Sequence, residues 1–379
     1  MSDSASALPR IVIVGAGFGG LWAAGALAHA PAQVTVIDER NYHLFQPLLY
    51  QVATAGLSPA DIAAPIRGIL SRQRNAHVVM GHVVGIDKAK HVVRLRERDV
   101  RYDWLIVATG ARHAYFGHEE WAEFAPALKN IDDATRLRRK ILMALERAEQ
   151  EPDPRKRQCL MTFVVVGGGA TGVETAGAIA ELVKVALARD FRAINPAMSR
   201  IILIEAGPRV LPSFAASLSA AAHRALAKLG VEVRLGQPVT RCDEAGVMLD
   251  EERVACGVTI WAAGVMASPA AQWLDTEHDR AGRVLVDRDL RLPGDPQIFV
   301  IGDTASVRDE AGKALPGIAT VAKQEGKYVA RWLHARLTGK TVPPPFHYRD
   351  YGELATVGRN FAVVDFRWVK LKGRIAWFV

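Results

Sequence analysis

Cysteine is scarce in this sequence of 379 residues, which contains only Cys159, Cys242 and Cys256. These cysteines form no C-x-x-C pair, and an odd number of them cannot build a fully paired disulfide framework. Such sparse usage is typical of a reducing compartment, where a thiol serves as a small buried apolar group. The low cysteine content therefore argues against a secreted disulfide scaffold and against catalysis by a redox-active cysteine pair.

Long apolar runs and concentrated charge are also missing. Half of the residues are hydrophobic and 23% are charged, which suits ordinary buried cores. No stretch of about 18 uncharged apolar residues occurs, so no membrane-spanning helix is predicted. The N-terminus lacks the charged and apolar regions of a secretory signal. The net charge of +8 is spread along the chain, apart from short groups such as 136–140 and 155–157, so we expect no nucleic-acid binding.

Glycine, in contrast, is abundant, and two of its clusters follow short apolar runs. In IVIVGAGFGG, at residues 11–20, the glycines match the G-x-G-x-x-G pattern and open a predicted helix over 18–30. Such a turn makes a tight bend, lets a pyrophosphate approach the backbone, and packs the helix on its strand. The next predicted strand, 34–37, ends in an acidic pair suited to a ribose hydroxyl. The residues assigned to this site are Gly15, Gly17, Phe18, Gly19, Gly20, Asp38 and Glu39.

A second glycine turn lies in FVVVGGGATGVETAG, at residues 163–177. Its ribose carboxylate is predicted to be Glu205, which ends the strand 201–204 and lies further from its turn than is usual. The charge of Glu205 repels a 2′-phosphate and favours NAD over NADP, whereas the neighbouring Arg209 leaves NADP open. The residues assigned to this second site are Gly167, Gly169, Thr171, Gly172, Glu174, Glu205 and Gly264.

The two turns belong to an internal repeat. Each copy runs through strand, glycine turn, helix, strand and acidic residue, and closes with VATG at 107–110 or WAAG at 261–264. The repeat predicts an α/β fold of two Rossmann-like domains, the second inserted in the first. A flavoprotein that oxidises a nicotinamide needs two such sites, one holding FAD permanently and one admitting NADH transiently. Hydride transfer between the two rings therefore explains the duplication.

Periodicity places further elements. It predicts helices over 60–72, 131–150 and 317–338. The segment EPDPRKR at 151–157 is interpreted as a linker and a domain boundary.

Several longer motifs resemble the type II NADH dehydrogenases, which are single-chain, non-pumping NADH:quinone oxidoreductases among the flavoproteins with two dinucleotide-binding domains. The motifs are NYHLFQPLLYQVATAGL (41–57), YDWLIVATGA (102–111), VVGGGATGVETAGAIAEL (165–182), IEAGPRVLPSF (204–214), IWAAGV (260–265), IFVIGDTA (298–305) and ATVAKQEGKYVA (319–330). The resemblance covers about residues 10–375. It implies electron transfer from NADH through FAD to a membrane quinone such as ubiquinone, without proton pumping.

The same resemblance implies a domain organisation. The FAD-binding domain is expected in two parts, at 9–125 and at 291–345, the second part including the helix on the quinone side. The NADH-binding domain is expected at 126–290, and a C-terminal segment at 346–379.

Further site residues follow from the resemblance. Gly302 and Asp303 are expected to bind the ribityl chain of FAD, Thr109 and Gly110 to contact FAD at the end of the sheet, and Val83 to lie near the adenine. On the quinone side the family pattern Ala-Gln-x-Ala-x-Gln is incomplete, because Thr320 replaces the first glutamine. The residues expected to face the quinone are Ala319, Thr320, Lys323 and Gln324, and no metal site is expected.

Glu174 lies two residues after Gly172, in the first turn of the second predicted helix. A carboxylate there interacts favourably with the helix dipole, which is one sufficient reason for its presence. The alternative, which we favour, is a catalytic role in contacting the nicotinamide ribose or amide, or in supplying a proton to the reduced quinone. Glu174 and Gln324 are the residues to which we assign catalysis.

Other activities of the same fold stay open. A ferredoxin or rubredoxin reductase needs no cysteine pair, whereas a sulfide:quinone oxidoreductase needs two cysteines beside the flavin, and none follows a flavin-side motif here. A non-catalytic sensor of FAD and NADH is the alternative from another class. These hypotheses differ in what reoxidises the flavin.

The last fourteen residues, FRWVKLKGRIAWFV, combine four basic residues with large apolar ones. This composition is typical of an interfacial segment, while the alternation at 366–372 equally suits a strand that pairs with VGRNFAVVDF. Because relatives generally continue further, we expect a shortened membrane-docking region and weak vesicle binding. The resemblance implies a peripheral location on the cytoplasmic side of the inner (plasma) membrane, or a soluble protein if the region is missing, and possible homodimers.

Overall fold

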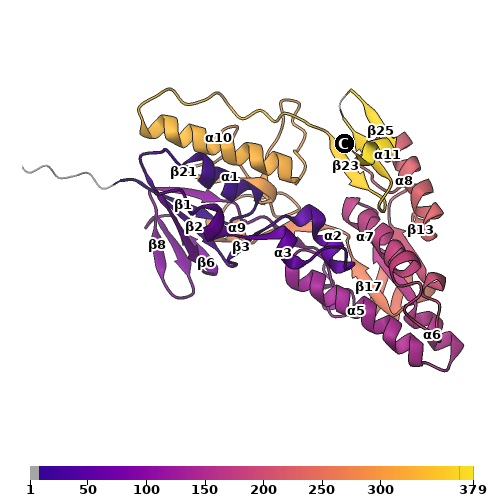
Figure 1. Ribbon diagram of the computed structural model, residues 1–379. Coiled ribbons are helices and arrows are strands. Elements are labelled where there is room, and N and C mark those ends of the chain that lie inside the picture. Colours follow the sequence, from indigo (N-terminus) through magenta and orange to yellow (C-terminus); the bar gives the residue numbers. More distant parts are fainter. Residues whose placement is uncertain (1–7, 367, 379) are drawn as a thin grey trace, which may run out of the picture. The chain divides into compact units, whose positions relative to one another are not determined.

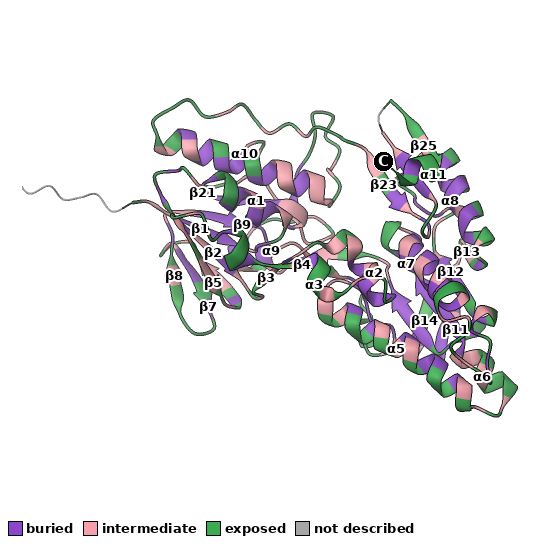
Figure 2. Ribbon diagram, viewed as in Figure 1, coloured by how far each residue is buried: buried purple, intermediate pink, exposed green. Residues whose placement is uncertain are grey.

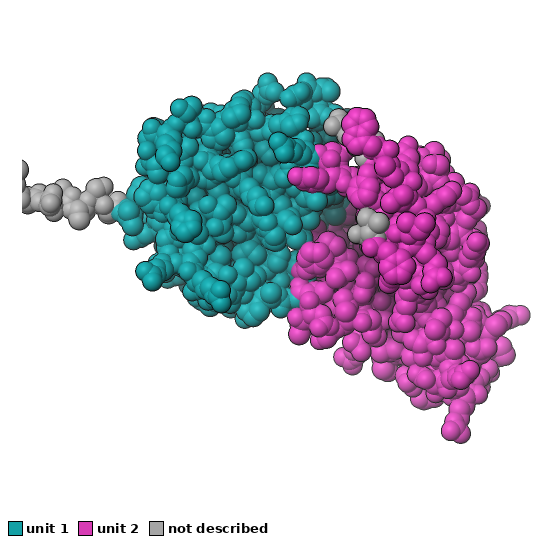
Figure 3. Space-filling view, turned by 45° about the horizontal axis from the view of Figure 1, so that its top comes forward, with its two compact units in different colours: residues 1–44, 63–112, 265–349 teal, residues 45–62, 113–264, 350–379 magenta. Residues whose placement is uncertain are grey.

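The computed structural model of the chain describes residues 8–366 and 368–378. The chain divides into two compact units, each assembled from three separate segments (Figure 3). Unit 1 comprises residues 1–44, 63–112 and 265–349, and unit 2 comprises residues 45–62, 113–264 and 350–379. The α/β class predicted from the sequence is confirmed, and each unit contains one of the two glycine turns.

The borders of the units differ from the domain limits expected at 125/126 and 290/291. Residues 113–125 pack with unit 2, because Trp261 donates a hydrogen bond to the carbonyl of Ala114 (2.9 Å) and the ring of Tyr115 stacks on the ring of Trp261. Residues 265–290 belong to unit 1, where α9 (Ala270–Leu274) packs on β6 (Val83–Asp87).

Unit 1 is built on a six-stranded sheet in the order β20-β21-β9-β1-β2-β5. All neighbours are parallel except β20 and β21. The central strands are almost continuous runs of buried Val, Ile and Leu, as expected for a parallel sheet covered on both faces (Figure 2). The strands are β20 (Arg291–Leu292), β21 (Asp295–Val300), β9 (Trp104–Val107), β1 (Arg10–Val14), β2 (Gln33–Asp38) and β5 (Ala76–Met80).

Two helices of unit 1 run side by side against this sheet, α1 (Phe18–Ala26) and α10 (Ala319–Leu337) (Figure 1). They approach closely because Gly326 of α10 has no side chain: a Cβ there would overlap the carbonyl oxygen of Gly19 in α1. The helix predicted over 18–30 ends earlier, at Ala26, and the helix predicted over 317–338 matches α10 closely.

The helix predicted over 60–72 is wrong as a single element. The structure has α3 (Pro59–Ile62), β4 (Ala63–Pro65) and α4 (Ile66–Ile69) instead. Pro65 explains the break, because proline disfavours helical backbone in the residue before it and cannot continue the helical hydrogen bonds. The β4 segment pairs with β3 (Tyr42–Leu44).

Smaller pairings complete unit 1. The antiparallel sheet β6-β7-β8 lies beside the main sheet (Figure 1), β19 pairs with β22, and β10 pairs with β18. The bounds are β7 (Val92–Leu95), β8 (Asp99–Arg101), β10 (Ala111–His113), β18 (Val265–Ala267), β19 (Val284–Leu285), β22 (Ala305–Ser306) and the short 3-10 helix η5 (Gly302–Thr304).

Unit 2 repeats the plan with a four-stranded parallel sheet in the order β13-β12-β11-β17. Helices α7 and α8 pack against it, and α2 packs on α5 and α7. The strands are β13 (Val231–Leu235), β12 (Arg200–Glu205), β11 (Thr162–Val166) and β17 (Val258–Trp261), with β14 (Val239–Asp243), β15 (Gly246–Leu249) and β16 (Glu252–Ala255) in a small antiparallel sheet. The helices are α2 (Leu49–Ala53), α5 (Ile131–Gln150), α6 (Pro154–Leu160), α7 (Ala170–Glu181) and α8 (Ala216–Lys228), with η1 (Gln46–Leu48), η2 (Glu119–Ala122), η3 (Leu182–Ala186) and η4 (Pro196–Met198).

The start of α5 agrees with its prediction, and a capping box explains why. The Asn130 side chain accepts a hydrogen bond from the backbone of Asp133, whose carboxylate accepts one from the backbone of Asn130. The segment 151–157, expected to be a linker, is instead largely helical, since α6 starts at Pro154. Asp153 caps that helix by accepting from the backbone of Arg155 (2.8 Å), and proline is well suited to the first helical position.

The C-terminal segment forms an antiparallel sheet and a short helix in unit 2. Strand β24 pairs with β23 and with β25, so the strand alternative for this segment is realised at residues 370–373. The elements are β23 (Glu353–Thr356), β24 (Ala362–Asp365), β25 (Lys370–Gly373) and α11 (Arg374–Trp377). The predicted interfacial residues Arg367 and Val379 lie outside the described residues.

Candidate functional site

The first glycine turn closes the carboxyl end of β1 between its two neighbouring strands. The backbone of Gly15 donates to the carbonyl of Ile37 in β2 (2.7 Å), and the backbone of Ala108 donates to the carbonyl of Val14 (2.8 Å). Gly15 has a φ of +100°, and a Cβ on it would run into the carbonyl of Ala108. The turn therefore requires glycine at this position for reasons of backbone geometry alone.

Gly17 has no such internal reason to be glycine. Its φ of −70° suits any residue, and a Cβ on it would meet no atom within 4 Å. Gly20 differs, since a Cβ there would overlap the carbonyl oxygen of Gly15. Open space at the one glycine that begins helix α1 fits a pyrophosphate that approaches the backbone closely, so the residues present fit a bound dinucleotide.

Asp38 is bound to this turn. Its carboxylate accepts from the backbone of Ala16 (2.7 Å) and from the backbone of Arg40 (2.8 Å). Burial raises the pKa of Asp38, and these two hydrogen bonds act against that rise. Glu39 points elsewhere, toward the guanidinium of Arg40 (3.0 Å) and the ring of His82 (3.5 Å).

The sheet edge beside this turn gathers the other predicted flavin residues. The hydroxyls of Thr109 and Ser268 lie 2.5 Å apart, and Thr304 donates to the carbonyl of Gly110 (3.3 Å). Gly302 follows β21, with a φ of +68°, and the Asp303 carboxylate lies beside Gly317. Val83 is buried at the start of β6. Because β1, β9 and β21 are parallel neighbours, their carboxyl ends bring Thr109, Gly110, Gly302 and Asp303 to one edge, whereas Val83 belongs to the separate sheet β6-β7-β8.

Glu325 is a site residue that sequence reasoning missed. It is only 1% exposed, and its carboxylate accepts from the backbone of Gly302 (2.5 Å). Burial raises the pKa of Glu325 to about 8, and the nearby charge of Asp303 adds to the rise. A carboxyl on the inward face of an otherwise apolar helix pattern is the signal that would have found it.

The residues predicted to face a quinone all lie on α10. Lys323 places its ammonium 4.4 Å from the ring centre of Trp22, and Thr320 lies 3.2 Å from the hydroxyl of Tyr348. The Gln324 amide donates to the carbonyl of Arg349 (2.8 Å) and accepts from its backbone N–H (3.0 Å). Ala319 begins the helix.

The second glycine turn, in unit 2, repeats the contacts of the first turn with its two neighbouring strands. Gly167 donates to the carbonyl of Ile204 (2.7 Å), and Ala262 donates to the carbonyl of Val166 (2.7 Å). Gly167 has a φ of +111°, and a Cβ on Gly172 would overlap its carbonyl oxygen.

The open position of the first turn is repeated as well. A Cβ on Gly169 would meet nothing within 4 Å. Thr171 is exposed in the first turn of α7. The residues of the second turn therefore also fit a dinucleotide pyrophosphate.

Glu205 takes the place of Asp38 in this second turn. Its carboxylate accepts from the backbone of Gly168 (2.5 Å) and from that of Gly207 (2.6 Å). Arg209, the residue that left NADP open, is held by the carbonyl of Pro212 (2.7 Å).

Phe116 is a second residue that the sequence did not single out. Its backbone has a φ of +55°, which is strained for an aromatic residue, and its side chain is 68% exposed. The ring lies against Gly264, because a Cβ on Gly264 would overlap it. This exposed aromatic ring lies near the carboxyl end of β17, where ligands bind in such sheets, so it could contact a bound ligand.

Glu174 has unusual surroundings in the first turn of α7. Part of its surface stays exposed, yet its carboxyl is so densely surrounded that desolvation raises its pKa to about 8. Thr356 of β23 opposes this rise by donating from its backbone (3.3 Å) and from its hydroxyl. A carboxyl that keeps its proton near neutral pH is suited to proton transfer.

The cysteines are placed in structural positions. Cys242 and Cys256 are buried in the core of unit 2, and burial raises their pKa values to about 12 and about 11. Cys159 lies in α6 and its pKa is also raised by burial. All three cysteines belong to unit 2, whereas the residues expected to bind FAD belong to unit 1.

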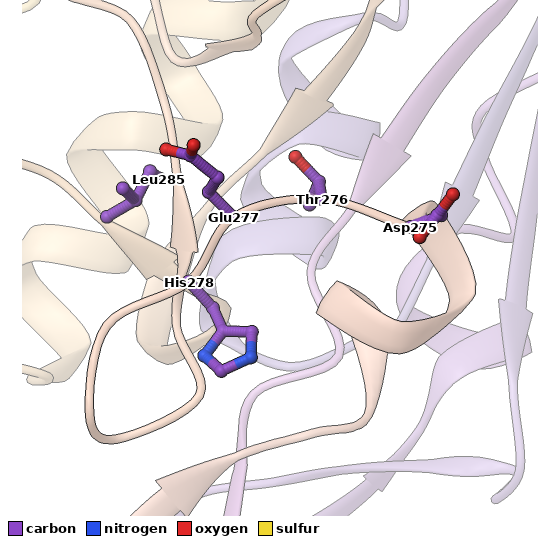
Figure 4. A pocket seen from close by; sticks show the side chains of 5 residues that line it. All are labelled: Asp275, Thr276, Glu277, His278 and Leu285. Carbon is purple, nitrogen blue, oxygen red and sulfur yellow. The ribbon is translucent and has the colours of Figure 1, made fainter.

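Unit 1 also has an open pocket of about 600 Å³ after α9 (Figure 4). None of the residues predicted to bind a ligand lines it. The lining residues are Asp275, Thr276, Glu277, His278 and Leu285.

Comparison with known proteins places this geometry in a family. The family model described as pyridine nucleotide-disulphide oxidoreductase matches residues 9–326. The type II NADH:quinone oxidoreductase Ndh of Mycobacterium tuberculosis is 45% identical over 98% of this chain and 82% of its own length. The mitochondrial internal alternative NAD(P)H-ubiquinone oxidoreductase A1 of Arabidopsis thaliana is 29% identical over 98% of this chain and 79% of its own length.

The structure of NDH2 from Plasmodium falciparum in complex with NADH shares the fold, with a TM-score of 0.88 at 22% identity over 98% of this chain and 92% of that one. The fold and the sequence similarity agree with the resemblance found in the motifs. The chain belongs to the pyridine nucleotide-disulphide oxidoreductase family and, within it, to the type II NADH:quinone oxidoreductases.

Proposed function

We propose that this protein oxidises NADH and passes two electrons through FAD to a quinone, without pumping protons. The observation that carries the proposal is the duplicated turn: each unit holds a glycine turn whose acidic residue and open glycine suit one dinucleotide. FAD, when bound, accepts a hydride from a nicotinamide and returns the electrons to an acceptor. Two relatives of this chain are named as an NADH:quinone oxidoreductase and an NAD(P)H-ubiquinone oxidoreductase, which supports the two substrates.

We assign FAD to unit 1 and NADH to unit 2. Unit 1 offers the first turn, Asp38, and the edge formed by Thr109, Gly110 and Asp303. Unit 2 offers the second turn and Glu205, whose charge disfavours the 2′-phosphate of NADPH. The Arg209 guanidinium, which could bind a 2′-phosphate, donates instead to the carbonyl of Pro212. We therefore expect the preference for NADH to hold.

Phe116 extends the NADH site. Its exposed ring beside Gly264 offers an apolar face to the nicotinamide half of the coenzyme. Ring contact would restrict the nicotinamide to few orientations, which is the contribution a protein makes to hydride transfer.

Glu174 and α10 complete the proposed chemistry. Reduction of a quinone takes up two protons, and the hydride from NADH accounts for only one of them together with both electrons. We assign the delivery of the other proton to Glu174, whose raised pKa leaves it protonated near neutral pH. Thr320, Lys323 and Gln324 are the polar groups of α10 assigned to the quinone side.

The test of this function separates the two half-reactions. Under anaerobic conditions, NADH should bleach the flavin of the purified protein, and a water-soluble ubiquinone or menaquinone analogue should restore its colour. NADPH should act more weakly than NADH. Reoxidation by a small iron–sulfur protein but not by quinone would instead indicate a ferredoxin reductase, and absence of bleaching would indicate a sensor.

We also propose that the C-terminal segment docks on an anionic membrane surface. The described residues in this segment include apolar side chains that are largely exposed, with Trp368 90%, Ile375 72% and Phe378 77% exposed, beside the basic Lys370 and Lys372. Aromatic and basic groups together favour the lipid interface. No helix among the described residues is long and apolar enough to cross a bilayer.

Vesicle sedimentation tests the docking proposal. The protein should bind vesicles that contain anionic lipid at low salt and dissociate at high salt, because part of the attraction is screened. Replacing Trp368, Ile375 and Phe378 together by serine should abolish binding. Met198→Ser, at an equally exposed apolar side chain of unit 2, is the matched control and should bind like the unaltered protein. Binding that survives the triple replacement would place the docking surface elsewhere.

A further inference from the structure

Glu174 stands at the end of a line of hydrogen-bonded side chains from three distant parts of the sequence. The Gln51 amide donates to the hydroxyl oxygen of Tyr50 (3.1 Å). The Tyr50 hydroxyl lies 2.9 Å from the hydroxyl of Thr356, which in turn bonds to the Glu174 carboxylate. All four residues belong to unit 2, where α2 and β23 both pack against α7.

The chemistry of the two ends gives this line a direction. The Gln51 amide nitrogen only donates, so the Tyr50 oxygen accepts from it. An ionised Glu174 only accepts, so the Thr356 hydroxyl donates to it. In the ionised state the remaining hydrogen bond must therefore run from Tyr50 to Thr356, so every proton in the line points toward Glu174 once it has lost its own proton.

Glu174, Tyr50 and Gln51 are all half-buried residues, and burial raises the pKa of both Glu174 and Tyr50. The stronger effect is at the Glu174 carboxyl, whose pKa is raised to about 8. A buried acid that gives up a proton needs a route by which the next proton arrives. A row of hydroxyls that each accept one proton and pass on another provides such a route.

We propose that Tyr50 and Thr356 form a proton relay that reprotonates Glu174 after each turnover. Once Glu174 has released its proton, the Thr356 proton moves to Glu174, the Tyr50 proton moves to Thr356, and water supplies a proton to Tyr50. One proton enters for each one that leaves, and no electrons move along the line. Tyr50 and Thr356 act through Glu174 and are positioning residues; the inference rests on the function proposed above.

The charges around the relay favour this direction. Glu174 and Glu181 are the acidic groups that raise the pKa of Tyr50, after desolvation, and Arg359 lies against Glu181. On β23, Glu353 is engaged by the hydroxyl of Ser213 (2.6 Å). Tyr50 therefore keeps its own proton at neutral pH and serves as a carrier rather than as a base.

Thr356→Val and Tyr50→Phe test the relay, since each removes a hydroxyl and keeps the shape of the side chain. Flavin reduction by NADH should stay within about twofold of the unaltered rate, while reoxidation by quinone should slow by at least about tenfold, in the range of a lost proton-transfer contribution. The double variant should be no slower than the slower single variant. If both hydroxyls act in one relay, losing either one already stops proton transfer, and losing the second adds nothing. Thr175→Val is the matched control, because the Thr175 hydroxyl is buried on the same helix and has no hydrogen-bond partner among the described residues.

A spectroscopic readout separates the relay from a loss of structure. Infrared titration of the oxidised protein, with Glu174→Gln as the reference, follows the carbonyl band of the protonated Glu174. Thr356→Val should shift that titration to higher pH, since a donor to the carboxylate is lost, and Thr175→Val should not. Unchanged reoxidation in both relay variants, or rate losses that multiply in the double variant, would overturn the relay. If the unaltered protein were never reoxidised by quinone, the proposed function would fail instead, and the infrared titration would still decide whether the hydrogen-bonded line exists.

Discussion

The two glycine turns use the same backbone contacts, yet the residues around them differ in kind. The carboxylates of Asp38 and Glu205 each accept a hydrogen bond from the backbone of the second residue of their own turn. Each also accepts one from the backbone of the residue two positions after the carboxylate itself. The carbonyl of that second residue is held differently. His43 donates to it in the first turn (Ala16, 2.9 Å), whereas the backbone of Leu211 does so in the second (Gly168, 2.7 Å).

The clearest difference lies two residues after the last glycine of each turn. The first turn has Trp22 there, covered by the ammonium of Lys323. The second turn has Glu174, bound to Thr356. The same helical position thus packs an aromatic ring in unit 1 and holds an ionisable carboxyl in unit 2. On the assignment proposed above, the turn that retains FAD is reinforced by packing, while the turn that admits NADH carries a carboxyl able to exchange a proton.

Each unit nevertheless holds one desolvated glutamate with a pKa near 8, Glu325 in unit 1 and Glu174 in unit 2. The largest effect that we expect is on the pH dependence of the free energy of unfolding. A carboxyl with a raised folded pKa stabilises the fold fully below its unfolded pKa of about 4.5, and this contribution is lost as pH rises toward 8. For the fully buried Glu325 the loss corresponds to up to about 5 kcal/mol. Glu325→Gln should remove most of this pH dependence in urea unfolding between pH 5 and 8.

Glu174→Gln is the counterpart in unit 2. It should change the stability profile less and reduce quinone turnover more, because the carboxyl is assigned to catalysis. A flat stability profile in the unaltered protein between pH 5 and 8 would contradict the first expectation. If both variants lowered quinone turnover equally, the proposed distinction between a structural Glu325 and a proton-transferring Glu174 would be wrong.

Replacement of the last glycine of each turn by alanine should separate the two turns next. In Gly20→Ala and Gly172→Ala the new Cβ overlaps a carbonyl oxygen, so each should destabilise its unit by about 1–3 kcal/mol. Gly20→Ala should lose FAD, measured as the ratio of flavin to protein absorbance. Gly172→Ala should keep FAD but no longer be bleached by NADH. Gly25→Ala, where a Cβ meets nothing, is the control and should retain both properties.

Much of this arrangement could be predicted from sequence because it depends on short-range patterns. Buried strands read as apolar runs, and the turns between β1 and α1 and between β11 and α7 have a glycine spacing imposed by steric overlap. Pro65 and the pair Asp153-Pro154 are also local signals, for a helix break and for a helix start. The helix predicted over 60–72 and the linker predicted over 151–157 both neglected them.

The remainder depends on contacts between distant segments. No local pattern places Tyr50 and Thr356 beside Glu174, or Glu325 under Gly302, because each pair is joined only by the packing of separate elements. Phe116 was missed for the same reason: its positive φ and its contact with Gly264 are tertiary features. The desolvation that raises the pKa of Glu174 likewise exists only after folding.

Replacing the acidic residue of each turn by its amide should show which turn sets the preference for NADH over NADPH. Glu205→Gln weakens two charge-assisted hydrogen bonds and removes the repulsion of a 2′-phosphate, so kcat/KM for NADH should fall by about 10- to 100-fold, as for a loss of about 1.5–3 kcal/mol. The value for NADPH should fall less. Asp38→Asn is the counterpart in unit 1 and should weaken FAD retention without changing the NADH to NADPH ratio. A change of coenzyme preference in Asp38→Asn would reverse the assignment of the two turns.

The smallest effect on the fold is expected where the comparison is closest, at the open glycines. Gly17 and Gly169 have ordinary φ values, and a methyl group added to either would have no neighbour within 4 Å, so alanine should not strain either unit. It should raise the stability of the ligand-free units by about 0.4–1 kcal/mol, because alanine lowers the entropy of the unfolded chain. Ligand binding should nevertheless suffer, with Gly17→Ala releasing FAD and Gly169→Ala raising KM for NADH. Thermal unfolding, flavin content and steady-state kinetics on the same preparations measure all three. Opposite signs for stability and binding would show that these glycines are required by the ligands and not by the fold, whereas a loss of stability in either variant would mean that the turn itself needs them.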